Sequence, residues 1–454
     1  MTGSRPAPPR RPAGRPRAVR RRRDAVLAAV VATALVGVGL VTGILPSPVG
    51  GASADPASCT VDALTAGWST GTLHLSAAEV DGDAGAGVLD VRGDVPAATA
   101  STMKVLTAAA AVESLGPDRR VATRVLQGPR ADTVVLVGGG DPTLSRLPAG
   151  TDGVYPDAPH LDDLARQVLD ARRADPDLAD VPIRRLQADS SLFTGPVWLP
   201  EWPLEARRGG SMSNITALMV DGDRDDPAEP YSRRGDAAVA RAADAFAALL
   251  GDDVAADGPL VTAAAGSAVL GTVESAPVRD LVGYMLTHSD GTLAETLARL
   301  VSIEEGARSA AADIQRGTPA ALAGLDLPAD GVVLVDGSGL SYANRVPAAL
   351  LTRLMVRVAE HRGDLAVAGR TGTLAEGGRF TGEADAAAGR IRGKTGTLER
   401  MHGLTGIADA EDGTEVAFTI WAEDVDPSVP AESARAEIDS LATDLHRCGG
   451  ALGG

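Results

Sequence analysis

The stretch from Ala25 to Leu45 constrains what this chain can fold into more than any other feature, because its 21 residues carry no charge and can span a bilayer. Nine arginines and no acidic residue lie ahead of it, within residues 1–23. Positive charge on that flank places the head in the cytoplasm and everything after the stretch outside. We therefore expect a disordered Arg-rich head at 1–23, a transmembrane anchor or signal segment at 24–45, a linker at 46–58, and export of the rest.

Small residues at Ala52-Ser53-Ala54 are also typical of a signal cleavage site. The exported part is thus either held at the membrane by the N-terminal segment or secreted after cleavage near Ala54. Beyond the head the chain is acidic, since the formal net charge of −17 includes the nine arginines of residues 1–23. An acidic body argues against nucleic acid as a partner. The length of the whole chain, 454 residues, and its hydrophobic fraction of 44% predict two or three packed units.

The two cysteines, Cys59 and Cys448, lie at opposite ends of the part expected to fold outside the cell. In an oxidising compartment such a pair indicates one disulfide that joins the termini, although two unrelated thiols are the alternative. The six histidines form no H-E-x-x-H pattern and no cluster with cysteine, so neither a metal nor another cofactor is expected.

Short β-branched runs alternate with segments whose apolar residues recur every three or four positions. These segments predict helices at 101–115, 237–250, 291–303, 347–361 and 433–446. The runs predict strands at 134–137 and 332–335, and a hairpin at 404–420. Without a clean βαβ rhythm the pattern predicts an α+β fold. The turn-rich residues 116–274 are interpreted as an inserted accessory region, mainly β, within a domain formed by 59–115 and 275–449.

Lysine is scarce: the chain has 41 Arg but only two Lys, Lys104 and Lys394. A lysine kept in such a composition is a candidate for work that Arg cannot do, such as losing its proton. Lys104 follows Ser101 by three positions at the start of an expected helix, so the hydroxyl and the amine share one face. This spacing predicts a serine nucleophile with an adjacent amine base; a capping serine beside a surface lysine is the alternative.

Lys394 begins the run Lys394-Thr395-Gly396-Thr397. A Gly-containing strand edge with a cation and hydroxyls is suited to a substrate carboxylate and to an oxyanion, whereas the alternative is an ordinary turn. Arg370-Thr371-Gly372-Thr373-Leu374 is a near-copy with Arg in place of Lys, and we interpret it as a structural loop. Gly67-Trp68-Ser69-Thr70-Gly71 matches the G-x-S-x-G elbow of other hydrolases, but a strand is expected after it and not before it, so we interpret it as a chance match.

Together these motifs resemble the D-alanyl-D-alanine carboxypeptidases/endopeptidases of the low-molecular-mass class C penicillin-binding proteins. The resemblance covers about residues 59–448 and rests on PAATASTMKVLTAAAAVESLG, VVLVGGGDPTLS, HSDGTLAETLAR, LVDGSGLSYANRV and AGRTGTLAEGGRF…GRIRGKTGTLERMHGLTGI. It implies a penicillin-recognising serine transpeptidase-like domain, with an antiparallel sheet and helices on both faces.

The resemblance also implies residue roles and partners. Ser101 would be the acylated nucleophile and Lys104 its base, with Ser289 relaying a proton to the leaving amine. Lys394, Thr395, Gly396 and Thr397 would bind the substrate. Peptidoglycan stem peptides would be the substrates, and β-lactams would be covalent inhibitors.

Gly291 departs from the family pattern, which has Asn at the third position of the middle motif that begins at Ser289. The departure leaves two alternatives to a serine D,D-peptidase. One is a catalytically impaired pseudo-enzyme that acts in wall binding or scaffolding. The other is a β-lactamase or esterase on the same fold.

Overall fold

The computed structural model describes residues 58–452, apart from 83–87, 257, 259, 326 and 328–330. The predicted head, the predicted membrane segment and all of the predicted linker except Ser58 therefore lie outside the described residues. Within the described part, no helix is both long enough and apolar enough to cross a membrane.

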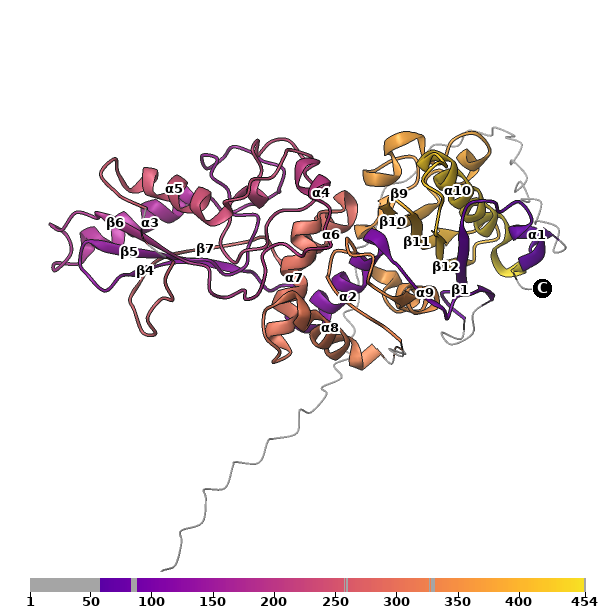
Figure 1. Ribbon diagram of the computed structural model, residues 1–454, viewed down its shortest axis with the longest axis horizontal. Helices are drawn as coiled ribbons and strands as arrows, with labels where there is room; N and C mark the ends of the chain where they lie inside the picture. The colour runs from indigo at the N-terminus through magenta and orange to yellow at the C-terminus, as the bar shows by residue number, and fades with distance from the viewer. Residues whose placement is uncertain are drawn as a thin grey trace, which may run out of the picture. The chain divides into compact units, whose positions relative to one another are not determined.

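The larger sheet is antiparallel and has the order β2-β1-β12-β11-β10-β9. Alternate residues of β12 enter two different cores. Val416, Phe418 and Ile420 pack with helix α10 on one face, and Ala417 and Trp421 pack in the core of the other face, which includes helix α9. Helices therefore cover both faces, as the sequence predicted (Figure 1). The elements are β1 (Thr72–Glu79), β2 (Leu89–Val91), β9 (Ala366–Val367), β10 (Ile391–Leu398), β11 (Met401–Asp409), β12 (Glu415–Glu423), α9 (Ala348–Arg357) and α10 (Ala431–Cys448).

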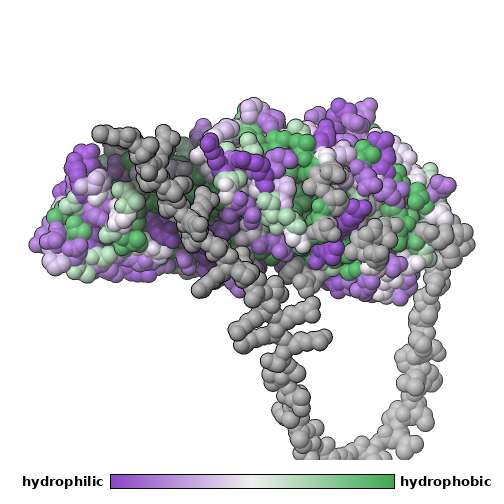
Figure 2. Space-filling model, turned by 90° about the horizontal axis from the view of Figure 1, so that it is seen from below, coloured by the Kyte–Doolittle hydropathy of each residue, from purple (hydrophilic) through white to green (hydrophobic). Residues whose placement is uncertain are grey.

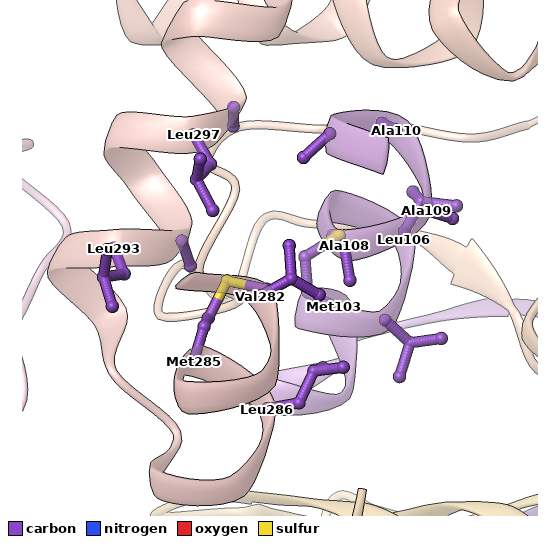
Figure 3. Close-up of a cluster of buried hydrophobic side chains, with 14 of the residues drawn as sticks. Met103, Leu106, Ala108, Ala109, Ala110, Val282, Met285, Leu286, Leu293 and Leu297 are labelled. Atoms are coloured by element: carbon purple, nitrogen blue, oxygen red, sulfur yellow. The ribbon is translucent and has the colours of Figure 1, made fainter. Parts of the chain in front are cut away.

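A helical layer surrounds α2 (Met103–Leu115), which the neighbouring helices bury on nearly every side. Its Ala-rich sequence lets other helices approach closely, and Figure 3 shows side chains of α6 and α7 directed toward it. The partners are α6 (Val278–His288), α7 (Gly291–Glu304) and α8 (Ile314–Leu322). The start of α2 is thereby fixed between this layer and the sheet, where β10 passes a 3₁₀ turn at Ala100–Thr102.

Residues 116–274, the region that the sequence predicts to be inserted, contain a second sheet with the order β6-β5-β4-β7, in which β5 and β6 run parallel. Helices α3 and α5 pack on it around a separate core. The region is therefore mixed α and β, and not mainly β as the sequence predicted, because its helices hold more residues than its strands. Hydrophilic residues cover much of its outer end on the face drawn in Figure 2. The elements are β4 (Ala122–Gln127), β5 (Thr133–Val137), β6 (Arg185–Asp189), β7 (Val269–Glu274), α3 (Leu161–Ala174), α4 (Leu204–Arg208) and α5 (Ala238–Leu250).

Part of the inserted region does not belong to that separate core. Phe193, Trp202, Met212 and Ile215 are buried together with α2, α6 and α7. Residues of the inserted region therefore help to build the surroundings of the α2 start.

Other sequence predictions met different outcomes. The hairpin is confirmed as β11 and β12, and the disulfide is present between Cys59 and Cys448. The strand predicted at 332–335 is wrong, because Val333 makes only an isolated bridge to Arg345. The remaining elements are α1 (Val61–Thr65) and the two-stranded sheet of β3 (Pro96–Ala97) and β8 (Val346–Pro347).

Candidate active site

A cavity of about 500 Å³ lies where the start of α2, the α6–α7 junction, β10 and the inserted region meet. Four residues named by the sequence, Ser101, Lys104, Ser289 and Thr395, line it together although they are far apart in the chain. Thr397 and Gly291 line it as well. Lys394 and Gly396 are absent from the lining in the described part of the chain.

Ser101 and Lys104 are in direct contact. Ser101 lies in the 3₁₀ turn that opens α2, and Lys104 Nζ lies 2.9 Å from its Oγ. Lys104 is only 2% exposed, and its amine also donates to the Ser338 carbonyl at 2.7 Å. Burial lowers the pKa of Lys104 from 10.5 to about 8, against the opposing attraction of Asp336 and Asp290. The amine is thus partly neutral near physiological pH, as a base for Ser101 must be.

The loop that presents the Ser338 carbonyl is organised by the buried carboxylate of Asp336. This carboxylate accepts hydrogen bonds from the backbone N–H groups of Ser338, Gly339 and Ser341 at 3.1, 2.6 and 2.8 Å. Trp202, from the inserted region, donates its indole N–H to the same carboxylate at 2.8 Å. Sequence reasoning missed this loop as part of the site. The Gly-rich turn in LVDGSGLSYANRV could have indicated this loop, because a turn that lies close to other main chain requires glycine. Gly339 has φ +81° and lies against the Ala100 carbonyl.

Ser289 and Asp290 join α6 to α7. Ser289 takes the left-handed conformation, φ 58°, at the end of α6 and lines the cavity, without a hydrogen bond to Lys104. Asp290 caps α7 by accepting from the Leu293 N–H at 3.0 Å, and it also accepts from Arg224 and Tyr155 of the inserted region. The Asp290 side chain is therefore committed to structure.

Gly291 lies against the backbone of the inserted region. Its N–H donates to the Ser211 carbonyl at 3.1 Å, and a Cβ at this position would lie 2.7 Å from the same oxygen and 3.3 Å from Met212 Cε. Carbon and oxygen atoms do not approach so closely without displacement. The space that a side chain at position 291 would need is thus occupied by main chain.

Lys394 is fully buried in β10, and its ammonium donates to the Thr395 carbonyl at 2.8 Å. Burial and the nearby charge of Lys104 hold its pKa well below the usual value. Gly396 lets β10 pass close to the start of α2, since a Cβ there would lie 3.0 Å from the Thr99 carbonyl. Strand β9 pairs β10 only at Arg392 and Gly393, so the edge of β10 that follows has no partner strand on that side within the described residues.

The near-copy of the lysine motif also contributes to the cavity. Thr373 lines it, and its hydroxyl accepts from Thr395 Oγ1 at 2.8 Å. Our interpretation of residues 370–374 as a purely structural loop is therefore too narrow. Sequence reasoning also missed Arg379 and Arg435, which line the same side of the cavity; no spacing rule connects them with Lys394.

The chain is similar to known proteins over most of its length. The model of the D-Ala-D-Ala carboxypeptidase 3 (S13) family matches residues 70–258 and 227–445. Carboxypeptidase DacB of Mycolicibacterium smegmatis is 32% identical over 94% of this chain and 96% of its own length. Carboxypeptidase Rv3627c of Mycobacterium tuberculosis is 33% identical over 78% of this chain and 76% of its own length.

Among solved structures, penicillin binding protein 4 (dacB) from Haemophilus influenzae is similar with a TM-score of 0.65 and 18% identity, over 84% of this chain and 96% of that one. At that identity the likeness concerns the fold. The chain belongs to the S13 family of D-Ala-D-Ala carboxypeptidases. It is a low-molecular-mass class C penicillin-binding protein and a hydrolase of the D-Ala-D-Ala carboxypeptidase type.

Proposed function

We propose that the chain is an exported serine D,D-peptidase that cleaves D-Ala-D-Ala termini or D-amino-acid cross-links of peptidoglycan through an acyl-enzyme on Ser101. The observation that carries this proposal is the contact of 2.9 Å between Ser101 Oγ and the buried amine of Lys104. An amine with a pKa of about 8 can accept a proton, and the Ser338 carbonyl fixes its position.

In the proposed first step, neutral Lys104 takes the proton of Ser101 while Oγ attacks the scissile carbonyl. Backbone N–H groups on the open edge of β10 would stabilise the oxyanion. The proton then passes from Lys104 to the leaving D-amino acid, with Ser289, which lines the same cavity, as the relay. Water afterwards hydrolyses the ester on Ser101, with Lys104 again as base, and releases the shortened peptide.

The N-terminal segment supports the cellular part of the proposal. Its nine arginines and uncharged stretch favour export, with the chain either anchored in the membrane or released after cleavage near Ala54. Peptidoglycan stem peptides are the substrates that an exported enzyme of this family would meet. Comparison of the mature N-terminus with the printed sequence distinguishes anchoring from release.

Intact-protein mass after incubation with benzylpenicillin tests the chemistry. We expect one covalent adduct per chain, absent in Ser101→Ala. Lys104→Arg should form the adduct far more slowly, because Arg keeps its proton. No adduct on the wild-type protein, or one that persists in Ser101→Ala, would overturn the proposal.

The alternatives raised by Gly291 make different predictions. A pseudo-enzyme would bind wall fragments without releasing D-Ala, whereas a β-lactamase would turn over nitrocefin rapidly without a lasting adduct. The absence of Asn at position 291 fits the packing of this wall, where a Cβ would lie 2.7 Å from the Ser211 carbonyl oxygen. Release of D-Ala from a peptide ending in D-Ala-D-Ala separates these cases.

A further inference from the structure

The cavity is cationic although the chain as a whole is acidic. Its lining within the described residues includes five cations and one carboxylate, against a formal net charge of −17 for the protein. A concave cationic site in an acidic protein concentrates anions of the substrate. A ligand carboxylate can bind only a cation that is not already paired within the protein.

Two of the arginines come from the inserted region and are bound to protein partners. Arg224 donates to the buried carboxylate of Asp290 at 3.1 Å. Arg234 donates from Nε and Nη2 to the Gly210 carbonyl, at 2.9 and 2.6 Å, and is 2% exposed. Both guanidinium groups are fixed by protein partners and hold the wall of the cavity in place.

The cations next to β10 differ from one another. Arg379 forms a two-pronged ion pair with Asp439 of α10, through Nε at 2.7 Å and through Nη2. Lys394 is not part of the cavity lining, and its ammonium donates a hydrogen bond to the Thr395 carbonyl. Neither one presents an unpaired charge to the cavity.

Arg435 is the exception. It lies one turn before Asp439 on α10 and lines the cavity half-buried, while Asp439 is bound to Arg379. Within the described part of the chain, no carboxylate or carbonyl pairs with its guanidinium. Glu432 lies one turn earlier on the same helix and is exposed, but forms no ion pair with it there.

Three observations place Arg435 beside the threonines of β10. Burial lowers the pKa of His402, the cross-strand neighbour of Thr397, and the nearby charge of Arg435 lowers it further. The Nη1 atom of Arg435 lies 4.0 Å from where a Cβ would stand at Gly377, another residue of the cavity wall. The hydroxyls of Thr395 and Thr397 line the same cavity.

We infer that Arg435 binds the terminal carboxylate of the substrate, with the hydroxyl of Thr397, in the place that the sequence assigned to Lys394. This inference rests on the proposed D,D-peptidase function. A planar guanidinium binds a carboxylate with two parallel hydrogen bonds, which a buried ammonium cannot do. Lys394 then acts as a positioning residue that holds β10 beside the start of α2.

The test compares two β-lactams that differ only in the carboxylate: benzylpenicillin and its methyl ester. Rates of adduct formation are measured by mass for wild type, Arg435→Gln and Arg435→Lys. Wild type should prefer the free acid, and Arg435→Gln should lower that preference roughly ten- to a hundredfold, with little change for the ester. Arg435→Lys should retain part of the preference.

Arg447→Gln is the matched control, because Arg447 lies on the same helix, pairs with Asp444 and is outside the cavity lining. It should leave the preference unchanged. An unchanged preference in Arg435→Gln, with adducts still forming, would overturn the inference alone. The absence of any adduct on wild type would instead refute the proposed function, and an unchanged ester rate shows that Arg435→Gln has folded.

Discussion

Replacing Gly291 with Ala measures how firmly the inserted region closes the site. The new Cβ would lie 2.7 Å from the Ser211 carbonyl oxygen. That oxygen is main chain, and it accepts the Gly291 N–H, so it cannot rotate away as a side chain would. Overpacking of this kind costs about 1–3 kcal/mol, and a weakened hydrogen bond adds about 1 kcal/mol.

Helix propensity works in the other direction at this position. Gly291 is the first residue of α7, and Ala is favoured over Gly by up to about 1 kcal/mol within helices. The expected net loss for Gly291→Ala is therefore about 1–3 kcal/mol of unfolding free energy. Gly291→Asn, which restores the family pattern, should lose more and should acylate more slowly than wild type.

Gly283→Ala provides the matched control. Gly283 lies inside α6, and a Cβ there would have its nearest contact at 3.4 Å, an ordinary packing distance. This variant should gain about 0.5–1 kcal/mol from propensity alone. Urea unfolding followed by tryptophan fluorescence measures both variants. If Gly291→Ala were as stable as Gly283→Ala, or if Gly291→Asn acylated faster than wild type, the tight packing of the Ser211 carbonyl against Gly291 would be refuted.

Three further outcomes follow from the site and the fold. The rate of acylation by benzylpenicillin should rise about tenfold per pH unit up to about pH 8 and then level off. The reason is that only the neutral amine of Lys104, whose pKa is about 8, accepts a proton. Stopped-flow or mass measurements across pH 6–10 would show a flat profile if Lys104 were not the base. Replacing both Cys59 and Cys448 with Ala should lower the unfolding free energy by about 3–5 kcal/mol, because the disulfide closes a loop of 389 residues. The initial acylation rate of this variant should stay near that of wild type. Trp202→Phe should lower stability by about 1–3 kcal/mol in urea unfolding, because the buried Asp336 carboxylate loses an indole donor; equal stability would show that another donor replaces it.

The sequence predicted well those features that depend on local periodicity or on neighbouring residues. The pairing of Ser101 with Lys104 follows from i, i+3 geometry, and the hairpin follows from two apolar runs around a turn. The strand expected at 332–335 was wrong for a physical reason: side chains, and not a neighbouring strand, engage most of its backbone groups. Gln315 bonds the Val332 carbonyl and the Leu334 N–H, and Asn344 accepts from the Val335 N–H.

The wider site depends on contacts between distant segments, which no local pattern encodes. Ser211 meets Gly291 across 80 positions, and Trp202 reaches Asp336 across 134. The part of the site that binds the substrate carboxylate illustrates the same limit. The scarcity of lysine pointed to Lys394, but only the fold reveals that its ammonium faces a carbonyl and that Arg435 faces the cavity.

The burial of both lysines also affects how the protein can be labelled. Lys104 and Lys394 are 2% and 0% exposed, and the chain contains no other lysine side chain. Amine-directed dyes and crosslinkers would therefore find no accessible side-chain amine on the folded protein. Labelling at Lys394 would report opening of β10, and labelling at Lys104 would report opening of the start of α2. The two lysines are thus natural reporters of local unfolding, with no added tag.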